Sequence, residues 1–222
     1  MKRIRPKSLY GRLVVSVKYP FMDWARRARM ERLIDEMDLK GGERILDIGG
    51  YPSFWAECPF SLKLTILNLP GAGLKPIETH HEVELVEGDG CELTQFANDS
   101  FDIAFSNSVI EHVGSPERQR AMAAEAQRVA SGYWVQTPSI WFPMEAHTNM
   151  PFWWFYPESV REALMRRWRR RLPAYASMLD HTTVISHADM GSMFPDGRIW
   201  TERIFGLPKS YVAYKPAELG SQ

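Results

Sequence analysis

The sequence predicts an α/β fold built on a mostly parallel sheet that carries helices on both faces. The first observation is a series of short apolar runs separated by turn residues, at 44–48, 62–67, 83–86, 101–105 and 133–137. Runs of this length and spacing are typical of buried parallel strands, which are joined by crossover segments. The second observation is a helical pattern from Pro116 to Val129, with Ser115 as the expected N-cap. Together they indicate a doubly wound sheet.

Segments near both ends of the chain complete the predicted architecture. Apolar residues at helical spacing predict a helix over 19–39, which two glycines then end. Two alternating runs at 198–205 and 211–215 predict a closing antiparallel hairpin, separated by the segment 206–210. The hairpin brings the expected sheet to seven strands.

The segment between the fifth strand and the hairpin has a different composition. Seven aromatic residues and two prolines fall within 141–156, and a helix is predicted over 157–171. We interpret this segment as an insertion that covers the functional edge of the sheet. The chain is therefore expected to form one domain of four parts: a helical N-terminal extension (1–42), a core (43–137), an aromatic-rich cap (138–180) and a C-terminal helix and hairpin (181–222).

Composition and charge narrow the class of protein. The 222 residues include 27 basic and 27 acidic side chains, so the chain as a whole is no polyanion binder. The charge is uneven, with nine Lys or Arg and one acid in 1–30, but eleven acids and two Arg in 78–125. Two cysteines without CxxC spacing indicate reduced thiols. No apolar stretch approaches the length of a membrane span, and we expect a cytoplasmic location.

Glycines and polar residues follow four of the predicted strands. Asp47 and Gly49-Gly50 end the first strand, and Asn68 ends the second about twenty residues later. The third ends in Gly88-Asp-Gly90, and the fourth runs into Ser106-Asn-Ser-Val-Ile-Glu-His112. Open α/β sheets bind ligands outside the carboxyl ends of their strands, and glycine there lets a ligand approach the backbone. Each motif is common alone, but four in this order predict a site for a nucleoside cofactor.

In these motifs the sequence resembles the class I S-adenosylmethionine-dependent methyltransferases, over residues 43–137 and more weakly in the hairpin. The resemblance implies a Rossmann-like sheet, a bacterial origin and S-adenosylmethionine as the cofactor. It also implies which residues contact the cofactor. The methionine part is expected to contact Asp47, Gly49 and Gly50, and the ribose Asn68 and Leu69. The adenine is expected to contact Asp89, Gly90 and Cys91, and the methyl group lies near Asn107.

The sequence departs from the family pattern in two places. Its glycine loop is short, because Gly49-Gly50 is followed by Tyr51 and Pro52, and Asn68 stands where the family usually has an acid. An amide can bond both ribose hydroxyls, but without the strength that a charge adds. These departures leave open an alternative function, in which a degenerate methyltransferase fold binds or regulates a partner.

The candidate catalytic residues follow the fourth and fifth strands. Methyl transfer needs an acceptor aligned with the S–CH3 bond and, for a hydroxyl acceptor, a base that removes its proton. Glu111 and His112 follow the fourth strand, whereas Glu145 and His147 lie in an irregular loop after the fifth. We expect His147 to be the base, with His112 as the alternative, although either imidazole could have a packing or surface role. Glu145 and His147 could hold a divalent ion, but two ligands predict no metal site.

The cap and the basic segments are expected to select the acceptor. Trp141, Trp153 and Trp154 either pack on the core or form a stacking surface for sugar rings beside Glu145. The basic runs at 2–18 and 166–171 are either solvated or attract a lipid-linked substrate, a nucleotide-linked substrate or an anionic membrane.

The expected activity is O-methylation of a small molecule or a sugar hydroxyl. N-methylating members of the family often carry Asn/Asp-Pro-Pro-Tyr after the fourth strand, and this chain has Ser106-Asn-Ser-Val there. The difference argues against N-methylation of bases or amides, and therefore against a nucleic-acid acceptor. An RNA methyltransferase that uses the basic segments is the other alternative.

Overall fold

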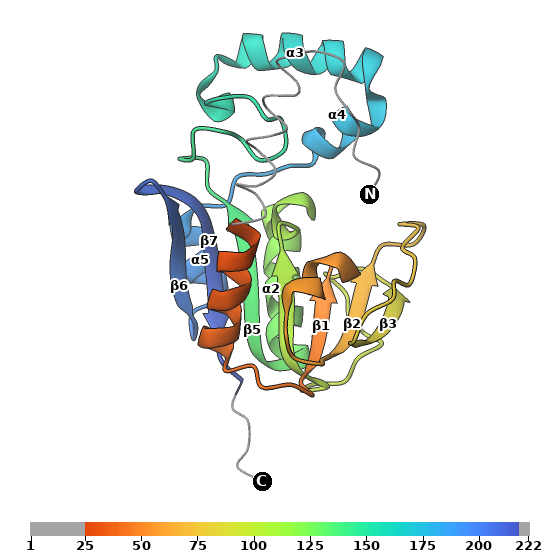
Figure 1. The fold of residues 1–222 in the computed structure, drawn as a ribbon. Coiled ribbons are helices and arrows are strands. Elements are labelled where there is room, and N and C mark those ends of the chain that lie inside the picture. Colours follow the sequence, from red (N-terminus) through yellow and green to blue (C-terminus); the bar gives the residue numbers. More distant parts are fainter. Residues whose placement is uncertain (1–24, 218–222) are drawn as a thin grey trace.

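A seven-stranded sheet forms the centre of the computed structural model, which describes residues 25–217 (Figure 1). Its strands lie in the order β3-β2-β1-β4-β5-β7-β6. The first five strands pair in parallel, whereas β7 is antiparallel to both β5 and β6. The structure therefore confirms the predicted α/β class, the mostly parallel sheet and the antiparallel C-terminal hairpin.

The predicted strands and helices agree closely with the observed ones. The strands are β1 (Arg44–Ile48), β2 (Lys63–Asn68), β3 (Glu82–Glu87), β4 (Phe101–Asn107), β5 (Ala130–Pro138), β6 (Arg198–Ile204) and β7 (Leu207–Lys215). The helices are α2 (Pro116–Val129), α3 (Glu158–Arg171), α4 (Pro173–Asp180) and α5 (His187–Met193). Residues 25–37 are also helical, and the first part of the helix predicted over 19–39 lies outside the described residues.

Helices cover both faces of the sheet, as expected for a doubly wound fold. On one face, Met122 of α2 and Met190 of α5 join a core with Leu46 and Tyr133. On the other face, Met30, Leu33 and Met37 of the N-terminal helix pack with Trp55 and Trp134. Figure 1 shows this helix on one side of the sheet, with α2 and α5 on the other.

The crossovers differ from the prediction. Among the parallel strands, the described crossovers contain an α-helix only between β4 and β5. β1 is followed by the short 3-10 helix η1 (Pro52–Glu57), and β2 by the irregular segment 69–81. Pro52, Pro70 and the glycines at 71 and 73 oppose a longer helix in these segments. The N-terminal helix covers the sheet where crossover helices were expected.

The hairpin is tighter than its predicted form. The second strand begins at Leu207, so Phe205 and Gly206 alone make the turn that was predicted to span 206–210. Both have positive φ, 50° and 78°, which is the backbone geometry that two-residue hairpin turns require. The result is a nine-residue strand that pairs with the whole carboxyl half of β5.

A separate apolar cluster holds the segment after β5 together above the sheet. Trp153 of the 3-10 helix η3 (Trp153–Phe155) packs with Met165 of α3 and Ala176 of α4. Figure 1 shows α3 and α4 beyond the carboxyl ends of the parallel strands. This position leaves the loop between β5 and η3 next to the ends of β4 and β5.

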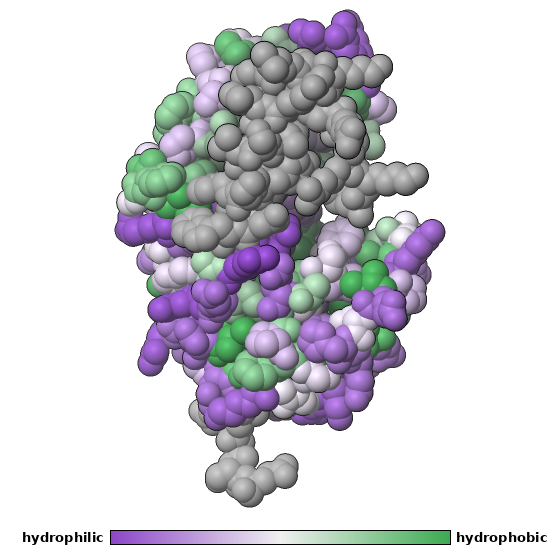
Figure 2. Space-filling model, viewed as in Figure 1, coloured by the Kyte–Doolittle hydropathy of each residue, from purple (hydrophilic) through white to green (hydrophobic). Residues whose placement is uncertain are grey.

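The surface gives no sign of a membrane-spanning segment in the described part of the chain. Figure 2 shows hydrophilic residues over much of the sheet-bearing half of the visible face, with smaller hydrophobic areas between them. No helix within residues 25–217 is both long and apolar enough to cross a bilayer. The basic segment at 2–18 lies outside the described residues.

Candidate active site

Asp47 is buried against the glycine loop that follows β1. Its side chain is fully buried, and its Oδ2 accepts a hydrogen bond of 2.9 Å from Nε1 of Trp55. A Cβ atom at Gly50 would lie 1.8 Å from that same oxygen, so this close approach requires glycine. Burial raises the pKa of Asp47 to about 7. The acid that was expected to contact the cofactor is therefore enclosed by protein and fixes the loop.

The loops after β1, β2 and β4 contact one another at the carboxyl edge. The amide of Gly49 donates to the carbonyl of Leu67, and a Cβ at Gly49 would lie 2.6 Å from Cγ2 of Val109. The side-chain amide of Asn68 donates to the carbonyl of Gly50 at 2.9 Å, while the next residue, Leu69, is exposed. The structure thus brings the predicted methionine and ribose positions together.

Asp89 lies after β3 in an ion pair. Its Oδ2 lies 2.7 Å from Nη2 of Arg118, and its Oδ1 accepts the amide of Cys91 at 2.9 Å. Burial alone would raise the pKa of Asp89, but these hydrogen bonds outweigh it and hold the pKa below its ordinary value. Gly90 lies against Ile48, where a Cβ would come within 2.6 Å of Cγ2. The predicted adenine acid is therefore charged, half-exposed and paired within the protein.

Asn107, at the end of β4, is held by the N-terminal helix. Nη1 of Arg29 donates to Oδ1 of Asn107 at 2.6 Å, and Nη2 of the same guanidinium contacts Glu202 of β6 at 2.7 Å. The residue expected beneath the methyl group is thus tied to two elements that are distant in sequence.

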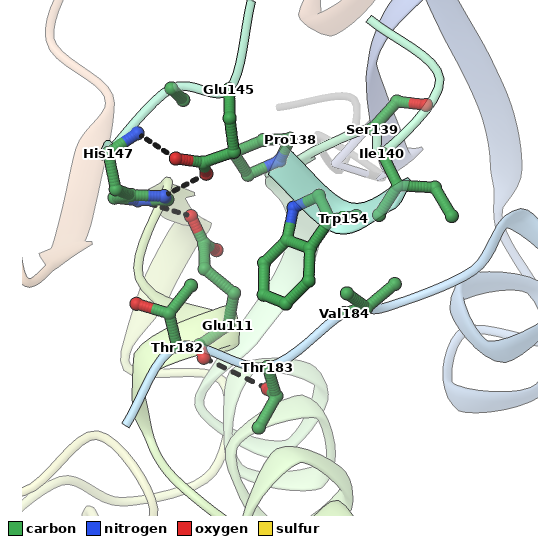
Figure 3. Close-up of a pocket in the computed structure, with 11 residues that line it drawn as sticks. Glu111, Pro138, Ser139, Ile140, Glu145, His147, Trp154, Thr182, Thr183 and Val184 are labelled. Atoms are coloured by element: carbon green, nitrogen blue, oxygen red, sulfur yellow. Dashed lines mark hydrogen bonds and ion pairs between the residues drawn. The ribbon is translucent and has the colours of Figure 1, made fainter. Parts of the chain in front are cut away.

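Four polar side chains converge where β4 and β5 end. Glu111 and His112 come from the 3-10 helix η2 (Ile110–His112), and Glu145 and His147 come from the loop after β5. Nε2 of His147 lies 2.9 Å from Nε2 of His112, and its Nδ1 lies 2.8 Å from Oε1 of Glu145. Glu111 is buried, with its Oε1 3.7 Å from Nε2 of His147 (Figure 3). The structure brings together all the residues that were predicted to be catalytic.

The environment shifts the pKa values of these groups in different directions. Burial raises the pKa of Glu111 to about 7 and, together with the charge of His147, lowers the pKa of His112 to about 4. Burial would also lower the pKa of His147, but the hydrogen bond and the charge of Glu145 outweigh it and raise the pKa above its ordinary value. Adjacent groups with such divergent proton affinities are typical of acid–base sites.

Two cavities adjoin this cluster. The smaller, of about 20 Å³, is lined by Glu111, Glu145, His147 and Trp154, among others, and suits a single water-sized group. The larger, of about 260 Å³, lies within the cap and is lined by Trp153, Trp154 and charged residues that include Arg161. Glu145 and Trp154 line both cavities, so the cap cavity lies next to the histidine pair.

The three candidate substrate tryptophans occupy different environments. Trp153 is buried and packs against Trp168, with ring centroids 5.4 Å apart, so it stabilises the cap. Trp154 is half-buried between the two cavities. Trp141 is 57% exposed and contacts Phe155. Among the three, Trp154 is best placed to contact a molecule in either cavity.

Several residues of the site were not predicted. Trp55 could have been suspected, because it is the only indole in the short loop that follows Asp47. Arg29, Arg118 and Thr182 carried no local signal, since each reaches its partner across at least 29 positions of sequence. Their roles depend on tertiary contacts alone.

Part of the chain is similar to a known family of proteins. Residues 64–132 match the model of a methyltransferase domain. This segment includes Asn68, Asp89, Asn107 and Glu111 but ends before His147. No curated protein matches the chain by sequence.

Solved structures with a similar fold include several methyltransferases. Phosphoethanolamine N-methyltransferase 2 of Haemonchus contortus, in complex with S-adenosyl-L-methionine, aligns at a TM-score of 0.57 and 14% identity. The alignment covers 87% of this chain and 53% of that one, so this chain spans about half its length. The cyclopropane synthase MmaA2 of Mycobacterium tuberculosis aligns at 0.53 and 15%, over 79% of this chain and 61% of that one.

A third similar structure has a more comparable length. The N-terminal domain of EvdMO1 with SAH bound aligns at a TM-score of 0.51 and 16% identity, over 87% of this chain and 81% of that one. At these identities the similarity establishes the fold. Together with the family match, it is consistent with S-adenosylmethionine as the cofactor.

Proposed function

We propose that this chain transfers the methyl group of S-adenosylmethionine to an oxygen atom of a small molecule or glycan, which is supported by the methyltransferase-domain match over residues 64–132 and the fold shared with solved methyltransferases. The observation that carries the choice of oxygen is the cluster of Glu111, His112 and His147, backed by Glu145, where β4 and β5 end. A hydroxyl acceptor has to lose a proton during the reaction, and this cluster provides groups that can accept one.

The reaction needs few protein groups beyond alignment. The acceptor oxygen attacks the methyl carbon, the C–S bond breaks, and the sulfonium becomes a neutral thioether. The proton of the hydroxyl passes to Nε2 of His147, the ring nitrogen opposite the one that bonds to Glu145. That hydrogen bond fixes the tautomer and the orientation of the imidazole. Alignment of the two reactants supplies up to about 7–11 kcal/mol.

The cofactor is proposed to occupy the edge formed by β1, β2 and β3. The contact between Gly49 and Val109 and the bond from Asn68 to Gly50 join the loops after β1, β2 and β4 beside this edge. Asp89 remains the candidate for the adenine amino group, and Asn107 at the end of β4 is the candidate near the methyl group. The acceptor would then enter from the cap.

The lining of the cap cavity supports a polar acceptor of modest size. Trp154 offers an aromatic face, while Glu158, Arg161 and Glu162 offer charged hydrogen-bonding groups around the same space. A sugar ring or a hydroxylated small molecule combines an apolar face with polar edges, which fits this lining. A nucleic acid is not proposed, because both acidic and basic groups line the cavity.

The test has two stages. Calorimetry with S-adenosylmethionine should detect binding to the wild-type protein, weakened in Asp89→Ala. Transfer of a labelled methyl group is then followed with a panel of hydroxylated acceptors and, in parallel, matched amines. We expect product with a hydroxyl acceptor, and transfer to amines alone would overturn the choice of oxygen. A folded protein that binds no cofactor at millimolar concentration would overturn the enzymatic function.

One observation favours a second candidate, a binding or regulatory protein with this fold. The side chains expected to bind the cofactor are engaged within the protein, since Asp89 pairs with Arg118 and Asn68 bonds to Gly50. This candidate predicts that Asp89→Ala and Arg118→Ala have the same affinity for S-adenosylmethionine as the wild type.

A further inference from the structure

Three atoms that can bind a metal ion meet in the histidine cluster. They are Oε1 of Glu111 and the Nε2 atoms of His112 and His147, and all three lie within 4.8 Å of one another. Oε1 of Glu111 is buried and has no hydrogen-bond partner among the described residues. An unpaired buried carboxylate oxygen is costly, so its partner is expected to be a group that the chain itself does not supply.

Each imidazole has an oxygen partner at its Nδ1. Nδ1 of His147 faces Oε1 of Glu145 at 2.8 Å, and a carboxylate only accepts. Nδ1 of His112 faces Oγ1 of Thr182 at 3.1 Å, and that hydroxyl donates its own hydrogen to the carbonyl of Met178 at 3.0 Å. A hydrogen on Nδ1 of each ring satisfies these partners, and it is the arrangement that a metal bound at the two Nε2 atoms requires.

In this arrangement the two Nε2 atoms, 2.9 Å apart, are both acceptors. Two lone pairs at this distance repel unless a cation lies between or beside them. A histidine ligand of a metal typically donates its other ring hydrogen to a carboxylate or a similar oxygen, which is the arrangement of both rings here.

The triangle of acceptor atoms has the dimensions of a metal site. Its sides are 2.9 Å between the two Nε2 atoms, 3.7 Å from Oε1 of Glu111 to His147, and 4.0 Å from the same oxygen to His112. A single point lies about 2.1 Å from all three atoms, which is the length of a zinc–nitrogen or zinc–carboxylate bond.

The space beside the triangle provides an open position. The small cavity that Glu111 and His147 line has room for one water molecule or one hydroxyl group. Three protein ligands and one open position are the pattern of catalytic zinc sites. Mg²⁺ and Ca²⁺ favour oxygen ligands, so a site with two imidazoles does not suit either of these ions.

We infer that Glu111, His112 and His147 bind a divalent first-row transition metal such as Zn²⁺, with Glu145 and Thr182 orienting the two imidazoles. In the absence of a metal, an additional proton between the two Nε2 atoms would make one ring an imidazolium, and metal binding releases that proton to solvent. The sequence predicted no metal here because it paired Glu145 with His147 as ligands. In the structure Glu145 lies behind the imidazole, and Glu111 supplies the third ligand.

The role of this ion in catalysis rests on the proposed function, whereas its binding does not. With the ion in place, His147 is a ligand and no longer a free base. The hydroxyl of the acceptor then binds at the open position, where the metal lowers its pKa and its proton leaves to solvent. The alkoxide attacks the methyl carbon, and the thioether departs as before.

The first experiment measures metal binding alone. Full-length protein is treated with a chelator, dialysed and titrated with Zn²⁺ by calorimetry. We expect one ion per chain in the wild type and affinity losses of more than about 100-fold in Glu111→Gln, His112→Ala and His147→Ala, since loss of an outer partner alone costs about 10–100-fold. His187→Ala, an exposed histidine outside the cluster, is the matched control and should bind as the wild type does.

Two further measurements distinguish the loss of a metal ligand from the unfolding of a variant. Glu145→Gln keeps the size of the side chain and should weaken Zn²⁺ binding by about 10–100-fold. Bound Co²⁺ gives a visible absorption spectrum that reports its coordination, and we expect this spectrum in the wild type and its loss in His147→Ala. Circular dichroism identifies any variant that has unfolded.

The outcomes separate the metal site from the proposed function. No stoichiometric Zn²⁺ binding by folded wild-type protein, or equal affinity in the wild type and both histidine variants, overturns the metal site. Binding of S-adenosylmethionine is measured in parallel on the chelator-treated protein. If Zn²⁺ binds as expected but no acceptor is methylated, the function fails and the site stands. Methyl transfer that is undiminished in the chelator-treated protein removes the ion from the reaction.

Discussion

The two halves of the carboxyl edge differ in how their polar groups are bonded. Around the ends of β1, β2 and β3, Asp47 bonds to Trp55, Asn68 to a backbone carbonyl and Asp89 to Arg118. Around the ends of β4 and β5, two imidazole nitrogens lie 2.9 Å apart, and Oε1 of Glu111 has no partner among the described residues. We call these the cofactor half and the acceptor half.

The difference indicates where each half obtains its binding energy. In the cofactor half, the polar side chains bond to other protein groups and hold the loops after the strands. The acceptor half leaves a buried carboxylate oxygen of Glu111 without a partner among the described residues, which is costly and is typical of sites that serve a ligand or a reaction. Substitutions in the first half should therefore affect folding and cofactor affinity, and those in the second half should affect turnover.

The largest expected effect is on turnover, in the acceptor half. His147→Ala should lower kcat by about 10²–10⁴-fold, because the variant loses the proposed base or, with the metal bound, a ligand of the ion that activates the acceptor. The affinity for S-adenosylmethionine should change little, since the cofactor half is untouched. Steady-state kinetics and calorimetry on the same preparation measure both quantities.

A loss of less than about tenfold in His147→Ala would contradict this assignment. If His112→Ala then showed the large loss, the proton would be handled by His112, and His147 would be a cap residue. The exposed His187→Ala serves as the control for both, with kinetics equal to those of the wild type.

The next effect is on stability, in the cofactor half. Gly50→Ala places a methyl group 1.8 Å from Oδ2 of Asp47, where neither the buried acid nor the loop has room to move. We expect a loss of about 3 kcal/mol or more in the free energy of unfolding, measured with urea. The matched control is Gly191→Ala in α5, where a Cβ meets nothing within 4 Å and should stabilise the helix by about 0.5–1 kcal/mol. Equal stability of both variants would show that the loop after β1 is not held by Asp47.

The sequence predicted the cofactor half better than the acceptor half, for a physical reason. Strand ends and glycines are local signals, because the chain itself determines where a strand stops and which residue follows. Asp47, Asn68 and Asp89 were therefore placed at the correct edge. What the sequence could not supply was their partners, since Trp55 and Arg118 reach them through tertiary contacts.

In the acceptor half, the residues were identified but not their arrangement. His112 and His147 are 35 positions apart, and Thr182 lies 70 positions from His112. No pattern in the sequence fixes which nitrogen of a ring faces which partner. Helices in the crossovers were overestimated for a related reason. They are common in such segments, but the Pro- and Gly-rich connections between β1 and β3 form no α-helix, only the short 3-10 helix η1.

The third expected effect is a pH dependence of stability that originates from Asp47. Burial raises its folded-state pKa to about 7, whereas an unfolded aspartate titrates near ~3.9. The folded state therefore holds the proton more tightly. The stabilisation is complete below the unfolded pKa and is lost as the pH rises through the folded pKa. Relative to Asp47→Asn, the wild type should lose about 3 kcal/mol of unfolding free energy between pH 5 and pH 8.

Urea unfolding of both proteins at several pH values measures this effect, and the comparison cancels the contributions of all other groups. An unchanged difference across the range would mean that Asp47 stays ionised in the fold. The buried carboxylate would then need a further donor for Oδ1, which has no partner among residues 25–217.

The smallest expected effect is on the affinity for S-adenosylmethionine, and it tests whether the Arg118–Asp89 pair competes with the cofactor. Half-exposed ion pairs contribute about 0.2–1 kcal/mol, so releasing Asp89 in Arg118→Ala should strengthen S-adenosylmethionine binding by up to about fivefold. Arg120→Ala, which removes the nearby surface pair with Glu117, is the matched control and should have no effect. Weaker binding in Arg118→Ala would mean that the guanidinium itself contacts the cofactor, and unchanged binding would place the adenine away from Asp89. Calorimetry at two salt concentrations distinguishes these outcomes from a general change in surface charge, because screening reduces only the latter substantially.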